Sequence, residues 1–148
     1  MSETTDQLAY LKERITGSIT NVNSNRVYYR KMAYRFYIST VILSALTTII
    51  LGLNIEELKE AVRIIALIIT TTVTVLNAYI GYFNYKELWI AYNKALNQFA
   101  QLQFEIEFME KGGTALTLDQ ILVLRGRCQQ IYDELNATWQ KNRAPEKK

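Results

Sequence analysis

The sequence has no histidine, one cysteine, one proline and six glycines in 148 residues. Without histidine, a Ser-His-Asp triad and imidazole acid–base catalysis are unavailable. One cysteine excludes an intramolecular disulfide and a Cys/His zinc site. The glycine motifs that bind phosphates and the HExxH motif of metalloproteases are also missing. We therefore expect no cofactor, no metal site and no enzymatic activity.

The scarcity of turn-forming residues also limits the fold. Few prolines and glycines argue against a β fold with many turns, whereas leucine, isoleucine and alanine favour helices. The length allows one domain, at roughly 150 residues per domain. The net charge of +3 is too small to suggest a nucleic-acid partner. The sequence predicts an all-α protein of one domain.

Two long stretches contain no charged residue. Residues 36–55 have the sequence FYISTVILSALTTIILGLNI, and residues 64–85 have the sequence IIALIITTTVTVLNAYIGYFNY. A hydrocarbon layer of about 30 Å is spanned by about 20 helical residues, so both stretches are long enough to cross a bilayer. The alternative is a soluble bundle with two buried helices, but so short a chain has little left to surround them. We predict a multi-pass membrane protein with two transmembrane helices.

The charges on either side of these stretches predict an orientation. Arg26, Arg30, Lys31 and Arg35 precede the first span, whereas the connection between the spans is rich in glutamate. Because positive residues favour the cytoplasmic side, both termini are expected in the cytoplasm. The four basic residues could also bind a nucleotide messenger or anionic lipid, although the orientation already explains them.

The predicted organisation has six segments. They are a juxtamembrane helix (1–35), the first span (36–55), a short external loop (56–63), the second span (64–85), a cytoplasmic helical hairpin (86–143) and a disordered tail (144–148).

A heptad stripe follows the second span. Its members are Leu88, Tyr92, Ala95, Phe99, Leu102, Ile106 and Met109. With no helix breaker nearby, we expect the second span to continue into this segment as one helix. We further expect the stripe to join copies of the chain in a coiled-coil-like oligomer.

Further helices are predicted after this stripe and before the first span. Gly112 and Gly113 should end the helix, and Thr117 with Gln120 forms a capping-box pattern for the next, antiparallel one. On that second helix Cys128 occupies the inward stripe, which favours a small core residue over a redox sensor. Before the first span a weaker stripe runs from Leu8 to Phe36, and poor helix formers predict a break or frayed turn within residues 17–25.

Polar and small residues gather on one face of each span. On the second span they are Thr70, Thr74, Asn77, Gly81 and Asn84, and on the first they are Thr40, Ser44 and Thr47. In an oligomer these faces could line a water-filled pore. Alternatively, they could pack helices closely together, as small residues commonly do in membranes. The sequence leaves both interpretations open.

The layout resembles the SLATT domain, a two-transmembrane effector of bacterial defence systems. The similarity extends over residues 9–135 and includes the entry RVYYRKMAYRFY, the Ser/Thr-rich first span, the short acidic loop and the helix KELWIAYNKALNQFAQLQFEIEF. It implies an oligomeric pore-forming or membrane-disrupting effector of antiviral immunity that depolarises the inner membrane and arrests growth. It also implies a trigger, either a sensor protein of the defence system or a nucleotide second messenger. The alternative function is a non-conducting, membrane-anchored interaction or scaffold module.

Overall fold

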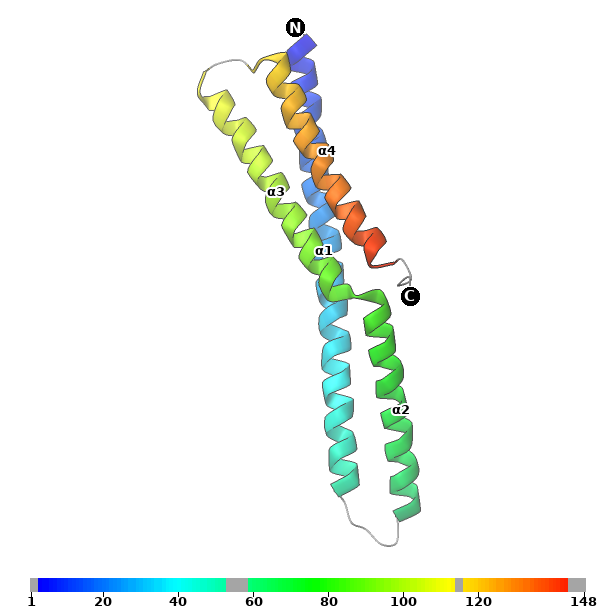
Figure 1. Ribbon diagram of the computed structural model, residues 1–148. Coiled ribbons are helices and arrows are strands. Elements are labelled where there is room, and N and C mark those ends of the chain that lie inside the picture. Colours follow the sequence, from blue (N-terminus) through cyan, green and yellow to red (C-terminus); the bar gives the residue numbers. More distant parts are fainter. Residues whose placement is uncertain (1–2, 53–58, 114–115, 144–148) are drawn as a thin grey trace.

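The chain folds into helices arranged in two stacked parts (Figure 1). The computed structural model describes residues 3–52, 59–113 and 116–143. The helices are α1 (Glu3–Gly52), α2 (Lys59–Phe83), α3 (Tyr85–Lys111) and α4 (Leu118–Lys141). The first half of α1 packs with α3 and α4 in a three-helix bundle, and its second half forms a hairpin with α2. The predicted all-α fold is confirmed.

The boundaries differ in part from the prediction. Residues 59–63, which were predicted to belong to the external loop, are part of α2. Residues 56–58 of that loop and the predicted tail 144–148 lie outside the described residues.

Helix α1 is unbroken through both parts. Its 50 residues give a rod about 75 Å long at 1.5 Å per residue. The break predicted within residues 17–25 is wrong, because the polar side chains there find partners without leaving the helix. Ser18 donates to the carbonyl oxygen of Arg14 and shares a short hydrogen bond with the Tyr132 hydroxyl, and Asn25 bonds to Asn21. Tertiary packing thus overrides weak helix propensity.

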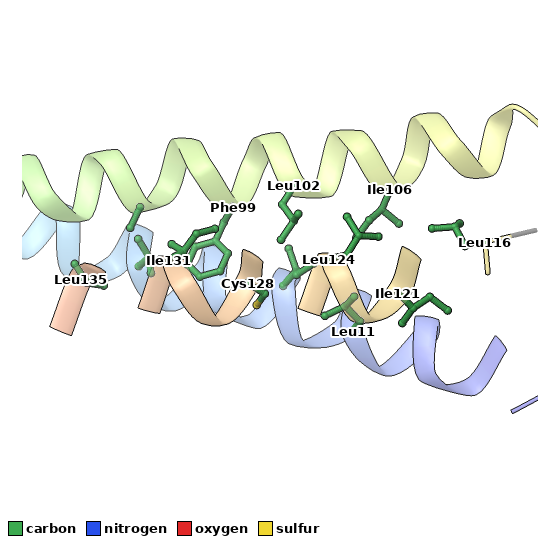
Figure 2. Packing of buried hydrophobic residues seen from close by; sticks show 13 residues of the cluster. Leu11, Phe99, Leu102, Ile106, Leu116, Ile121, Leu124, Cys128, Ile131 and Leu135 are labelled. Carbon is green, nitrogen blue, oxygen red and sulfur yellow. The ribbon is translucent and has the colours of Figure 1, made fainter. Parts of the chain in front are cut away.

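The bundle has a continuous apolar core (Figure 2). Phe99 is fully buried and contacts the ring of Tyr132 edge-on, with centroids 5.2 Å apart. The other buried members, from all three helices, are Leu11, Ile15, Val22, Ala95, Leu102, Ile106, Leu116, Ile121, Leu124, Cys128, Ile131 and Leu135. The predicted inward faces of residues 8–22 and of the last helix are therefore confirmed.

The core corrects one prediction about assembly. Within the stripe on α3, Leu88, Ala95, Phe99, Leu102 and Ile106 are buried inside a single chain, and Tyr92 and Met109 are partly buried. Helices α1 and α4 already occupy this face, so it is not free to join copies of the chain. A heptad pattern records that a face is covered, but not whether the covering helix belongs to the same chain.

The connection between α3 and α4 forms as predicted. Gly113, the second residue after α3, adopts a left-handed conformation with φ of 77°. Thr117 caps α4: its hydroxyl accepts from the backbone of Gln120, whose side chain accepts from the backbone of Thr117. These contacts satisfy amides that the first turn of a helix leaves unpaired.

The hairpin has one inward stripe on each helix. Half-buried residues recur on α1 at Phe36, Thr40, Leu43, Thr47 and Ile50, and on α2 around the buried Ala66 at Val62, Ile69, Val73, Leu76 and Ile80. The remaining faces carry exposed large apolar side chains, among them Ile42, Ile49, Ile64, Ile68 and Val75.

Two of the described helical segments are long and apolar enough to span a membrane. In the most apolar 18-residue window of the first none of the residues is buried, and in that of the second 6% are. The core helix of a soluble protein would be mostly buried, whereas the apolar residues of these two helices are exposed. At about 37 Å, the 25 residues of α2 exceed the roughly 30 Å thickness of the hydrocarbon layer.

Candidate functional site

The polar stripe of α2 lies on the outside of the single chain. Thr70, Thr74, Asn77 and Gly81 are all exposed, beside the stripe that contacts α1. A Cβ atom added at Gly81 would meet nothing within 4 Å. The stripe is therefore not used for packing within the hairpin, and its surface is open to a neighbouring helix or to water.

Within this stripe, the threonines and Asn77 differ in what they require. The hydroxyl of Thr70 donates to the carbonyl oxygen of Ala66 at 2.8 Å, and that of Thr74 donates to Thr70 at 3.0 Å. These hydroxyls are satisfied by their own helix. Among the described residues, no group forms a hydrogen bond with the Asn77 side chain. A carboxamide in hydrocarbon is costly without a partner, so Asn77 requires water or another chain.

The polar residues of α1 are divided between two environments. Thr40 and Thr47 are half-buried on the stripe that faces α2, and their hydroxyls donate to Phe36 and Leu43 in their own helix. They therefore contribute to the contact between the two helices, in which small side chains permit close approach. Ser44 is exposed. Of the three predicted residues on α1, only Ser44 shares the outward position of the α2 stripe.

Asn84 interrupts the helix that was predicted to be continuous. It adopts a left-handed backbone conformation, with φ of 42° and ψ of 48°, between the end of α2 and the start of α3. The expectation of one helix from the second span into the bundle is therefore wrong. The register that would have aligned the polar stripe of α2 with the stripe of α3 is lost at this residue. Asparagine tolerates this conformation better than most residues, which is the only local signal in the sequence.

Asn84 also contacts the residues that follow the last helix, at the junction end of the bundle. Its amide donates to the carboxylate of Glu87 in a short hydrogen bond, and to Asn142 after the end of α4 at 3.2 Å. Arg143 stacks between two rings, 4.7 Å from the centroid of Trp139 and 5.7 Å from that of Phe83. The last turn of α4 is thereby attached to the break between α2 and α3. Sequence reasoning missed this contact, because nothing in the sequence pairs residues 58 positions apart.

An aromatic cluster surrounds the junction between hairpin and bundle. Phe36 stacks on Tyr85 with centroids 5.5 Å apart, Tyr29 stacks on Tyr92 at 5.2 Å, and Phe83 stacks on Tyr85 at 5.5 Å. Aromatic rings favour the boundary between hydrocarbon and water. Aromatic residues from α1, from the end of α2 and from the start of α3 thus meet at one level of the molecule.

The conformation of Asn84 gives a testable prediction. We expect Asn84→Val to lower the stability of the junction by about 1–2 kcal/mol relative to Asn84→Gly, because a β-branched residue resists positive φ whereas glycine does not. Both variants lose the same side-chain hydrogen bonds, so their difference isolates the backbone. The thermal unfolding midpoints of the two purified variants in detergent check this, and equal midpoints would contradict the left-handed conformation.

The basic residues before the first span remain near the junction. Arg26 is half-buried and contacts Asn93 of α3 at 3.4 Å, whereas Arg30, Lys31 and Arg35 are exposed. In the described part of the chain, none of the four forms an ion pair. Three free cations at the aromatic level are suited to lipid headgroups.

Cys128 is a core residue. It is 5% exposed, and this burial raises the pKa of its thiol, with the guanidinium of Arg14 opposing the shift. A protonated, buried thiol is a poor nucleophile. This environment supports the structural interpretation over the redox sensor.

Comparison with known proteins places most of the chain in one family. Residues 20–113 match the model of a family described as a protein of unknown function, DUF4231. The chain belongs to this family. The matched region contains most of α1, all of α2 and α3 and the break at Asn84, whereas α4 and the start of α1 lie outside it. No curated protein and no solved structure matches the chain.

Proposed function

We propose that this DUF4231 protein is an oligomeric membrane effector whose hairpins form a pore, or disrupt the bilayer, when triggered. The observation that carries the proposal is the outward polar stripe on α2, on which the carboxamide of Asn77 has no hydrogen-bond partner among the described residues. Several copies that turned this stripe toward a common axis would give Asn77 water or a neighbouring chain, at no cost to the contact with α1. The exposed apolar residues on the other faces would then meet lipid.

The biological role that we propose rests on the resemblance to the SLATT domain. It is antiviral defence in bacteria, in which the pore depolarises the inner membrane and arrests growth. We propose that both termini and the bundle lie in the cytoplasm, since Arg30, Lys31 and Arg35 stand at the bundle end of the hairpin. In this orientation the bundle faces the compartment of the proposed trigger, a sensor protein or a nucleotide second messenger.

The experiment measures dye or ion leakage from liposomes that contain the purified protein. We expect Thr74→Leu with Asn77→Leu to reduce leakage to the level of protein-free liposomes, because the double variant removes the polar groups of the stripe. Thr71→Leu with Thr72→Leu is the matched control, since both residues are exposed on α2 but lie off the stripe. The control should leak like the wild type.

Two outcomes would count against the proposal. Unchanged leakage from the Thr74/Asn77 variant, with assembly intact, would remove this face from consideration. If the wild-type protein caused no leakage from liposomes and no depolarisation of the cells that express it, the non-conducting scaffold would be favoured instead.

A further inference from the structure

An open groove runs along the bundle between α1 and α4. It has a volume of 840 Å³, an apolar floor that includes Leu11 and Ile121, and an exposed leucine, Leu122, on its wall. Arg14 and Arg125 stand in the groove, and in the described part of the chain neither forms an ion pair. The groove therefore has an apolar floor, and its lining carries these two guanidinium groups together with the carboxylate of Asp6.

On the opposite side of the bundle, α3 presents two aromatic side chains outward. Phe104 and Phe108 are 68% and 70% exposed, and their rings stack on each other at 6.3 Å. Both lie on the side of α3 that faces away from its buried stripe. Exposed aromatic pairs of this kind serve as anchors of protein–protein interfaces, where they fill pockets on the partner.

A carboxylate accompanies this aromatic pair. Glu107 is exposed, and in the part of the chain that is described it receives a hydrogen bond from Gln103 at 3.0 Å but no cation. An aromatic pair with one carboxylate thus complements a groove that has an apolar floor and in which two guanidinium groups outnumber the one carboxylate of Asp6.

The two surfaces lie at the same level along the bundle. Lys12 of α1 pairs with Glu110 at 2.8 Å, and Arg127 of α4 pairs with Glu105 at 2.6 Å. These two ion pairs bracket Phe108 on α3, and the groove is lined by residues around Lys12 and Arg127 on the other two helices. The aromatic pair and the groove therefore overlap in height along the bundle.

The common height matters because copies that span a membrane in the same direction are related by a rotation axis perpendicular to the membrane. Proteins whose helices cross a bilayer in the same direction can form a ring only about an axis perpendicular to the membrane. Such a rotation brings together only patches at the same height. Two different patches that complement each other form a head-to-tail contact, which generates a closed ring when the rotation closes.

We propose that the Phe104–Phe108 pair of one copy fills the groove between α1 and α4 of the next copy, so that the chain assembles head to tail into a ring. Glu107 then pairs with Arg14 or Arg125 of the neighbouring copy. This inference rests on the proposed function in that it supplies the contact by which the pore oligomer forms. It replaces the α3 stripe, which is buried within each copy, with a surface that is free.

The test is disulfide crosslinking of the full chain in native membranes. The parent carries Cys128→Ala, which removes the only native thiol. Phe108→Cys combined with Leu122→Cys should give, on mild oxidation, a ladder that extends beyond the dimer. Each single-cysteine variant should give no ladder, and two differently tagged single variants should crosslink when expressed together.

Val123 provides a matched control for the groove position. It neighbours Leu122 and is 63% exposed, but it does not line the groove. Phe108→Cys with Val123→Cys should therefore give no ladder. An equal ladder from this pair, or none from the Leu122 pair, would overturn the interface. Crosslinking of Phe108→Cys to itself, stopping at the dimer, would replace the ring with a two-fold contact.

A second measurement does not depend on cysteines. Phe104→Gln with Phe108→Gln should convert the purified oligomer to monomers with unchanged helicity, because both side chains are exposed in the single chain. Ile90 is exposed on the same helix but does not line the groove. Ile90→Gln should therefore leave the oligomer intact. An intact oligomer in the double phenylalanine variant would overturn the proposal.

Leakage measured on the same proteins separates the two proposals. A ladder without leakage leaves the ring and removes the pore. Leakage without a ladder leaves the pore and removes this interface.

Discussion

Phe99→Ala is expected to destabilise the three-helix bundle by about 3–5 kcal/mol, the range measured for truncation of buried aromatic residues. Phe99 has no exposed surface, and its ring contacts Tyr132, which in turn holds Ser18 of α1. The cavity would therefore open where all three helices of the bundle meet. Thermal unfolding followed by circular dichroism measures the loss.

Val123→Ala is the control for this truncation. Its side chain is 63% exposed, so its removal should change stability by no more than about 0.5 kcal/mol. A Phe99→Ala protein as stable as this control would show that α1, α3 and α4 do not share the core described here.

Ile68→Asp is expected to abolish stable membrane insertion. Ile68 lies near the middle of α2, is 60% exposed and faces away from α1. Replacing an isoleucine with an aspartate at the centre of a transmembrane helix costs about 3–4 kcal/mol of insertion free energy. The fraction of protein that resists extraction from membranes by alkaline carbonate should fall sharply.

Val123→Asp makes the same chemical change at a matched position in the bundle. Both residues are β-branched and about equally exposed, so a hairpin surrounded by water would tolerate the two substitutions equally. We expect Val123→Asp to remain in the membrane fraction. Equal behaviour of the two variants would mean that this face of α2 does not meet lipid.

The sequence predicted the helical segments well because their signals are local. Uncharged runs, the Gly112–Gly113 stop and the Thr117 cap each depend on residues a few positions apart, and the structure places helices accordingly. The inward face from Leu11 to Val22 was also predictable, since helical periodicity shows which side is covered.

Partners in space were less predictable. The stripe around Phe99 is covered by α1 and α4 of the same chain, although its spacing is equally typical of an interface between copies. Thr40 and Thr74 occupy similar patterns, yet one faces α2 and the other faces outward. Asn84 was expected to continue a helix, because a single left-handed residue leaves almost no trace in a sequence. Each of these choices is decided by tertiary contacts.

The two helices of the hairpin differ in how they are joined to the bundle. Helix α1 passes from one part to the other without interruption, so a tilt of its first half tilts its second half by the same angle. Helix α2 instead meets the bundle at Asn84, where backbone rotation at one residue changes its direction without distorting α3. A displacement of the last turn of α4, transmitted by the contact between Arg143 and Phe83, would therefore change the direction of α2 more than that of α1. Of the two helices of the hairpin, α2 is the one that can move relative to the bundle.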